Sequence, residues 1–249
     1  MKYRLIVYGL LVVALALAWS VERGAYRVDD TTEILIVANP INQLNPVVRN
    51  PYQTEYEQML YPCVRINSPA GTGSGVVLNH KAHKEHKENT KNTYILTAAH
   101  VVENESEVDI EFYPQVSTSC LRASVVITDT SKDLALLCVL SDLCGESIYS
   151  ASLAPESYQA FLFTPIYTVG CSLGLLPRPS NGIITAINSD SWEVSSPILP
   201  GNSGGPVFDG RTYEVIGIAV WVKTYQGQLV TTMAGIVPIN QIYEFLNHR

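Results

Sequence analysis

The stretch PGNSGGPVFD, from Pro200 to Asp209, places a single serine in an unusual setting. Ser203 stands between small or turn-forming residues, and an apolar, strand-like run follows directly. Glycine inside a regular element is destabilising, so such a cluster marks an unusual backbone or a close approach by another group. Two interpretations are open: a plain hairpin turn, or a backbone bent so that its N–H groups converge on a reacting oxygen. The flanking residues are Gly201, Asn202, Gly204 and Gly205.

Length and composition limit the classes of protein to consider. The 249 residues are enough for one large domain or two small ones. Hydrophobic residues make up 47%, which allows a sizeable core, and the formal charge is −7. No strong basic patch stands out, so nucleic acid is not an expected partner. Many short runs of Val, Ile and Thr favour a β-rich protein.

The N-terminal segment differs from the rest of the chain. Lys2 and Arg4 precede the uncharged run LIVYGLLVVALALAWSV, residues 5–21, and the motif ALA at 16–18 within it offers a small-residue cleavage site. A short basic region before an apolar run is typical of an export signal, although the run is also close to the length of a membrane span. We expect residues 1–24 to be a signal peptide or membrane anchor and residues 25–55 an extension. The protein would then be exported: periplasmic, secreted, or attached to the membrane through residues 5–21.

From residue 56 onward, short apolar runs are separated by turn residues. Many closely spaced strands without helical segments between them predict two β-barrels or a sandwich. No internal repeat stands out. The C-terminal tail has apolar residues at helical spacing, at Ile239, Ile242, Tyr243 and Leu246.

Cysteine and histidine patterns bear on disulfides and metals. No C-x-x-C occurs, so a structural zinc site is not expected, while export would permit disulfides whose pairing stays open. The loop HKAHKEHKENTKN carries His80, His83 and His86 at steps of three. It is either a metal-binding trio or a solvated insertion, and its lysines favour the insertion because they would repel a cation. We therefore expect no metal and no cofactor. The five cysteines are Cys63, Cys120, Cys138, Cys144 and Cys171.

A serine hydroxyl becomes a nucleophile only beside a base, and that base needs an orienting partner. The candidate base is His100 in ILTAAHVV, which a strand ending in Ala98 and Ala99 would deliver. The candidate partner is Asp133 in SKDLALLCV, at the start of an apolar strand where an ionised group needs a partner. Taken singly, each residue has a plain structural explanation. His100 would be a core histidine with its hydrogen bonds satisfied, and Asp133 would be a strand cap.

Four segments in this order resemble the trypsin-like serine proteases, most closely the HtrA/DegP type. The resemblance covers roughly residues 60–247 and is supported by GIITAI, VIGIAV and GIVPINQIYEFL. It implies an all-β, chymotrypsin-like fold of two six-stranded antiparallel β-barrels with a C-terminal helix. The protease domain would span 56–249, with barrel one at about 56–150, barrel two at about 151–238 and the helix at 239–248. The four segments are GTGSGVVL, ILTAAHVV, KDLALL and PGNSGGPVFD.

The resemblance assigns the roles that the chemistry requires. Ser203 would attack the scissile carbonyl, His100 would carry its proton to the leaving amine, and Asp133 would hold the imidazole. The backbone N–H groups of Gly201 and Ser203 would form the oxyanion hole. The expected activity is that of a serine endopeptidase acting on proteins or peptides.

The resemblance also indicates a pocket for the residue before the scissile bond. Its base has no acidic residue, so Lys and Arg side chains would lose solvation without gaining a counter-charge. A branched side chain in the wall strand should narrow the entrance, and we expect cleavage after small aliphatic residues such as Val or Ala. The expected lining residues are Pro197, Ile198, Val220, Trp221, Val222 and Ala234.

The sequence also departs from the HtrA pattern. That type usually carries a PDZ domain after the protease domain, whereas this sequence ends at Arg249, so none is expected. GCSLG, residues 170–174, stands where an Asn-Pro pair is usual, so this loop should differ. One alternative function is a non-catalytic peptide-binding relative, and another is a metal-binding module on the His80–His86 loop. The complete triad favours the peptidase, and the sequence does not specify the oligomeric state.

Overall fold

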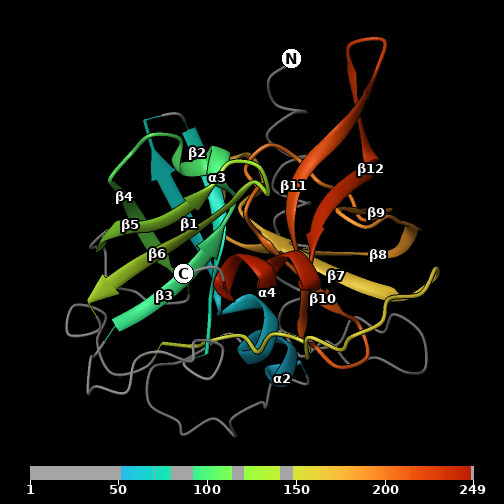
Figure 1. Cartoon of the computed structure of the whole chain (residues 1–249), viewed down its shortest axis with the longest axis horizontal. Coiled ribbons are helices and arrows are strands. Elements are labelled where there is room, and N and C mark those ends of the chain that lie inside the picture. The colour runs from blue at the N-terminus through green and yellow to red at the C-terminus, as the bar shows by residue number, and fades with distance from the viewer. Residues whose placement is uncertain (1–51, 70, 80–91, 114–120, 141–147, 248–249) are drawn as a thin grey trace, which may run out of the picture. The chain divides into compact units, whose positions relative to one another are not determined.

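A computed structural model of the chain describes residues 52–69, 71–79, 92–113, 121–140 and 148–247. Its strands form two closed barrels of six strands each, which lie side by side (Figure 1). This confirms the predicted all-β, two-barrel fold. Barrel one contains β1 (Cys63–Ser68), β2 (Gly71–Val77), β3 (Asn92–Thr97), β4 (Glu107–Phe112), β5 (Leu121–Asp129) and β6 (Leu134–Leu140). Barrel two contains β7 (Pro165–Gly170), β8 (Arg178–Ile187), β9 (Trp192–Val194), β10 (Pro206–Asp209), β11 (Val215–Tyr225) and β12 (Gln228–Pro238).

The two barrels share one strand order. Barrel one closes as β1-β2-β3-β6-β5-β4, and barrel two closes in the equivalent order β7-β8-β9-β12-β11-β10. All neighbouring strands within the barrels pair antiparallel. The chain therefore folds the same architecture twice, although its sequence shows no repeat.

Burial along β6 explains why it reads as an unbroken apolar run. Leu134, Leu136 and Leu137 are all buried, so neighbouring residues are covered on both faces of the strand. On one side it pairs with β3, where Leu137 lies opposite Ile95, and on the other with β5. An alternating pattern would place polar side chains into one of these faces. The strand is thus a fixed support for Asp133, the residue directly before it.

The structure corrects one local prediction, because β3 does not run as far as His100. The strand ends at Thr97, and His100 lies in the short helix α3 (Ala99–Val102). Val101 packs closely over Gly73, where an added Cβ would lie 2.5 Å from Val101 Cγ1. Packing against barrel one, rather than local propensity, thus turns this apolar segment into a helix.

Further helical segments lie at the two ends of the described chain. A short α2 (Gln53–Glu55) and the π-helical turn η1 (Tyr56–Leu60) lead into β1. The predicted C-terminal helix is confirmed as α4 (Ile239–Asn247), which packs against β11 and β12. Within the described part of the chain, no helix is long and apolar enough to cross a membrane. The predicted leader at 1–24, most of the extension at 25–55 and the His80–His86 loop lie outside the described residues.

Two buried thiols lie where the barrels meet. Cys63 Sγ lies 3.7 Å from the Val169 carbonyl oxygen of β7, and Cys171 Sγ lies 3.7 Å from the Val64 carbonyl oxygen of β1. Cys63, Cys138 and Cys171 are free thiols, whereas Cys120 and Cys144 lie outside the described residues. Burial raises the pKa of Cys63, which keeps this thiol protonated.

Candidate active site

Ser74 of β2 joins barrel one to the loop that contains Ser203. Its backbone N–H donates to the carbonyl oxygen of Ser203 at 2.8 Å, and its Oγ donates to the carbonyl oxygen of Gly201 at 2.6 Å. The same Oγ accepts a hydrogen bond from the backbone N–H of Cys171 at 2.8 Å. Because Ser74 is fully buried, these bonds are shielded from water and fix the loop against the opposite barrel.

The glycines of this loop are explained by tight packing as well as by backbone conformation. Gly201 has φ +95° and Gly204 has φ +82°, conformations that favour glycine. A Cβ on Gly204 would lie 2.2 Å from both Ser74 O and Thr97 Oγ1, and one on Gly201 would lie 2.4 Å from the Cys171 carbonyl oxygen. The loop is therefore not a plain hairpin turn but a bent backbone pressed between the two barrels.

Two backbone donors of this loop stay available. The N–H groups of Asn202, Gly204 and Gly205 bond to the carbonyl oxygens of Leu199, Ala219 and Asn202, at 3.0, 2.7 and 2.9 Å. Among the described residues, the N–H groups of Gly201 and Ser203 donate no hydrogen bond. Free N–H groups on a serine and on the residue two positions before it are the donor arrangement that an oxyanion hole requires.

Asp133 holds both the side chain and the backbone of His100. Asp133 Oδ2 lies 2.8 Å from His100 Nδ1, and Asp133 Oδ1 accepts the backbone N–H of His100 at 3.0 Å. The hydrogen bond to Asp133 raises the pKa of His100, and partial burial opposes this. Since Nδ1 faces the carboxylate, the neutral ring presents Nε2 as the free base.

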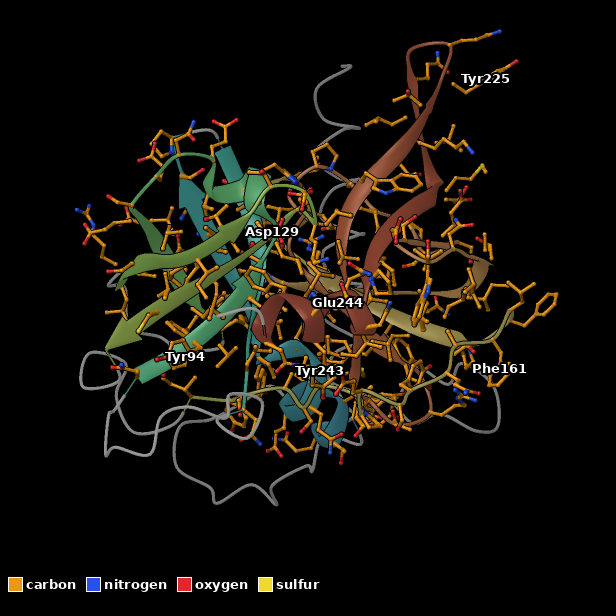
Figure 2. All side chains as sticks on the ribbon, viewed as in Figure 1. Tyr94, Asp129, Phe161, Tyr225, Tyr243 and Glu244 are labelled. Carbon is orange, nitrogen blue, oxygen red and sulfur yellow. The ribbon has the colours of Figure 1, made fainter. Side chains whose placement is uncertain are left out.

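The turn that carries Asp133 is itself well anchored. Asp133 has φ +55°, and Asp129 Oδ1 accepts hydrogen bonds from the backbone N–H groups of Ser131 and Lys132 at 2.9 and 3.0 Å. Lys132 Nζ donates to Glu244 Oε2 of α4 at 3.0 Å. Figure 2 labels Asp129 and Glu244, the two acidic residues that bond to this turn. These contacts let a non-glycine residue keep a left-handed conformation.

The structure joins His100 to Asp133, and it packs the loop of Ser203 against the segment that leads to His100. The position of a Cβ on Gly204 would lie 2.9 Å from Ala98 N, so the residue after Ser203 touches the segment that leads to His100. Ser203 is half-buried, and no hydrogen bond joins its Oγ to the His100 ring among the described residues. In enzymes without substrate such bonds are often long and shorten only in the complex.

The predicted pocket residues lie on three neighbouring segments. Val222 of β11 pairs with Ala234 of β12, so the two are neighbours on adjacent strands of the hairpin. Ile198 is buried, and its N–H donates to the Thr231 carbonyl oxygen at 3.0 Å. Pro197 is exposed and Val220 is buried. The Trp221 ring lies over Gly235, where a Cβ would be 1.8 Å from Trp221 Cε2.

Sequence reasoning missed two residues that support the loop. Ser74 stands in the quoted segment GTGSGVVL, but only its contacts across the barrels reveal its role. Arg65 of β1 donates through Nη1 to the Gly174 carbonyl oxygen at 2.6 Å and pairs with Glu111. Gly174 belongs to the short helix η4 (Ser172–Gly174), which packs on Gly201. No sequence pattern links an arginine in barrel one to a turn in barrel two.

Metal binding finds no support within the part of the chain that the structure describes. No group of three or more His, Cys, Asp or Glu side chains there is arranged to hold a metal ion. His80, His83 and His86 lie outside the described residues.

The double barrel, the glycine-rich loop of Ser203 and the histidine held by Asp133 point to a class of protein. The trypsin-like peptidase domain matches residues 73–218, more than half of the chain, and the chain belongs to this family. The protein named "Probable periplasmic serine endoprotease DegP-like" of Halomonas elongata is 34% identical over 144 residues, covering 54% of this chain and 28% of that protein. "Serine protease HtrA-like" of Staphylococcus epidermidis is 26% identical over 169 residues, covering 60% of this chain and 27% of that protein. The chain thus spans about a third or less of the length of these relatives.

Solved structures show the same fold. The HtrA-type protease AlgW with a tripeptide superposes with a TM-score of 0.63 at 19% identity, covering 78% of this chain and 62% of that chain. The serine endoprotease from Yersinia pestis gives a TM-score of 0.62 at 19% identity, covering 79% of this chain and 65% of that chain. At this level of identity, the likeness bears on the fold alone.

Proposed function

We propose that this protein is a serine endopeptidase with a Ser203–His100–Asp133 triad. One observation carries the proposal: Asp133 accepts hydrogen bonds from both the ring and the backbone of His100, and the N–H groups of Gly201 and Ser203 are free in the loop that carries the predicted nucleophile. A carboxylate that fixes a histidine in this way is the arrangement that nucleophilic catalysis by serine requires. Relatives named as serine endoproteases support the same activity.

The reaction follows from these positions. His100 Nε2 takes the proton of Ser203 Oγ as the oxygen attacks the scissile carbonyl, and Asp133 stabilises the imidazolium that forms. The tetrahedral oxyanion accepts hydrogen bonds from the N–H groups of Gly201 and Ser203, and each such donor lowers the barrier by about 3–4 kcal/mol. His100 then protonates the leaving amine, and water hydrolyses the acyl-enzyme by the same steps in reverse.

Covalent labelling and a serine variant test the proposal together. A fluorophosphonate probe should label the wild type at Ser203 and should not label Ser203→Ala, and only the wild type should cleave casein. A non-catalytic peptide-binding relative would bind peptides without labelling or cleavage, and that result would replace the proposal. Circular dichroism of Ser203→Ala should match the wild type, because the hydroxyl supports no other described contact.

We further propose that the pocket selects a small aliphatic residue before the scissile bond. Val222 is paired with fully buried Ala234 on the adjacent strand, and its branched side chain would narrow the entrance of the pocket. Val222→Gly should extend cleavage toward larger residues in a peptide library, and the gain should be graded, since one or two methylenes change selectivity by about 1–3 kcal/mol. Val230→Gly, in the same hairpin but paired with Lys223, is the matched control and should leave selectivity unchanged. Preferred cleavage by the wild type after Arg, Lys or Phe would contradict the pocket assignment.

Export of the protein through its N-terminal segment is also part of the proposal. We propose that residues 1–24 act as a signal peptide or membrane anchor, because a basic start precedes an uncharged apolar run. A relative named as periplasmic supports an extracytoplasmic site of action. Fractionation of cells producing the full chain, followed by N-terminal sequencing, distinguishes a cleaved signal from a retained anchor. Cytoplasmic recovery of unprocessed protein would overturn this part of the proposal.

A further inference from the structure

Two thiols from different barrels meet in the interior of the molecule. Cys63 is the first residue of β1, and Cys171 directly follows β7. Both side chains are fully buried, and β1 packs against β7 where the barrels join. About 100 residues of chain separate the two cysteines, so the packing of the barrels, and not their sequence positions, brings them together.

The backbone contacts of the two thiols are reciprocal. Cys171 Sγ lies 3.7 Å from the carbonyl oxygen of Val64, which is the residue after Cys63. Cys63 Sγ lies 3.7 Å from the carbonyl oxygen of Val169, which is two residues before Cys171. Each sulfur therefore reaches the backbone beside the other cysteine, so the two side chains point across the junction toward each other.

A hydrogen bond also joins the two thiols directly. Burial raises the pKa of Cys63, and the hydrogen bond to Cys171 raises it further. The same hydrogen bond lowers the pKa of Cys171, although burial opposes this. Ser74 and the charge of Arg65 also lower the pKa of Cys171, whereas Glu111 raises it. The opposite shifts mean that Cys63 donates the proton to the Cys171 sulfur, so no other side chain separates the two sulfurs.

We infer that Cys63 and Cys171 are a redox pair that forms a disulfide between the two barrels. A disulfide places its sulfurs about 2.05 Å apart, so the two sulfurs, already in hydrogen-bond contact, must approach further as their side chains rotate. An exported protein folds in a compartment where disulfides form and persist. The chemistry of the pair is independent of the proposed peptidase activity, and its occurrence in cells rests on the proposed export.

The oxidant is a soluble disulfide such as oxidised glutathione. One cysteine thiolate attacks a sulfur of the oxidant, forms a mixed disulfide and releases a first thiolate. The second cysteine thiolate attacks the protein sulfur of that mixed disulfide and releases a second thiolate. The protons lost by Cys63 and Cys171 end on the released thiolates, so the protein loses two electrons and the oxidant becomes two thiols. Because both cysteines are buried, the oxidant reaches them while the barrels are apart, as during folding.

The cross-link fastens the segment against which the nucleophile loop packs. The Cys171 N–H donates to Ser74 Oγ at 2.8 Å, and the Cys171 carbonyl oxygen accepts the Gly174 N–H at 2.9 Å. A Cβ on Gly201 would lie 2.4 Å from that same carbonyl oxygen. The disulfide therefore secures covalently the junction that Ser74 secures by hydrogen bonds.

Refolding under two redox conditions tests the pair directly. The Ser203→Ala protein, which should not cleave itself, is unfolded with reductant and refolded either in a glutathione redox buffer or in dithiothreitol. The remaining thiols are alkylated in denaturant, and the protein is digested without reduction for mass spectrometry. The glutathione sample should contain a peptide pair that joins Cys63 to Cys171, and Cys138 should be alkylated in both samples. Alkylation of Cys63 and Cys171 in both samples, stable glutathione adducts on them, or their pairing with another cysteine would overturn the inference.

Thermal unfolding gives a second measurement in the same Ser203→Ala background. The glutathione-refolded protein should unfold about 5–15 °C above the dithiothreitol-refolded protein, because the disulfide closes a loop of about 100 residues in the unfolded chain. Cys63→Ala should abolish this difference, whereas Cys138→Ala, a matched control on β6 of barrel one, should keep it. A difference that survives Cys63→Ala would assign the stabilisation to other cysteines and overturn the inference. Both measurements use the Ser203→Ala variant, so their failure leaves the proposed peptidase activity, tested by labelling of the wild type, untouched.

Discussion

Replacing Gly204 by alanine tests whether the glycines around Ser203 exist for conformation or for packing. The added Cβ would lie 2.2 Å from Ser74 O, 2.2 Å from Thr97 Oγ1 and 2.9 Å from Ala98 N. All three contacts are with barrel one, and two of them are backbone atoms that have no rotamer to change. The substitution therefore must separate the nucleophile loop from the strand that leads to His100.

The expected loss of stability has two parts. An alanine at φ +82° carries the strain of the left-handed region, about 1–2 kcal/mol. The collision with barrel one adds an overpacking cost of about 1–3 kcal/mol. Gly227→Ala separates the two parts, because Gly227 has φ +78° with no atom within 4 Å of its added Cβ. Gly227→Ala should show the strain alone, and Gly204→Ala should show both.

Thermal unfolding followed by circular dichroism measures this difference. The variants are best compared in a Ser203→Ala background, which prevents self-cleavage during heating. For a domain of this size, about 1 kcal/mol shifts Tm by about 2–4 °C, so Gly204→Ala should unfold about 2–12 °C below Gly227→Ala. With Ser203 restored, Gly204→Ala should lose most of its peptidase activity. Gly227→Ala should keep its activity on short peptide substrates. Equal Tm values for the two variants would refute the packing explanation.

Two further changes test the support of the triad and the oxyanion loop. Because Asp133 raises the pKa of His100, and only the neutral ring accepts a proton, wild-type kcat should fall as pH drops through a midpoint above about 6.5. Asp133→Asn should move that midpoint to lower pH and reduce kcat on the order of 10⁴-fold, and an unchanged pH profile would contradict the pairing. Arg65→Met should lower kcat by about tenfold with little change in KM, since a charged hydrogen bond to the Gly174 turn is worth about 1.5–3 kcal/mol. Arg122→Met, which removes an exposed arginine from the same barrel, is the control, and equal kcat values for both variants would exclude a positioning role.

Much of the fold could be predicted because it depends on local patterns. Short apolar runs at close spacing are sufficient to indicate an all-β protein, and the apolar spacing of the tail is sufficient to place α4. The end of β3 was not predictable in this way. Its apolar run continues into Val101 and Val102. The helical turn there depends on Val101 packing over Gly73, which has no side chain in the way. The shared strand order of the two barrels was equally hidden, because twelve strands can follow one topology without sharing any sequence.

The residues of the candidate site also differ in whether local sequence or the packing of the two barrels determines their role. Ser203, His100 and Asp133 stand in distinctive local segments, because each needs a particular backbone: a glycine-rich bend, a helical turn after a strand, or a left-handed residue before one. Ser74 acts through three hydrogen bonds to the opposite barrel and Arg65 through one, at positions about 100 or more residues away in the chain. A serine or an arginine in a strand fits many surroundings, and its role depends on which carbonyl the other barrel places opposite it. The proposed triad can therefore be predicted from local sequence, whereas the residues that hold the loop of Ser203 in place are recognised only when the two barrels are packed together.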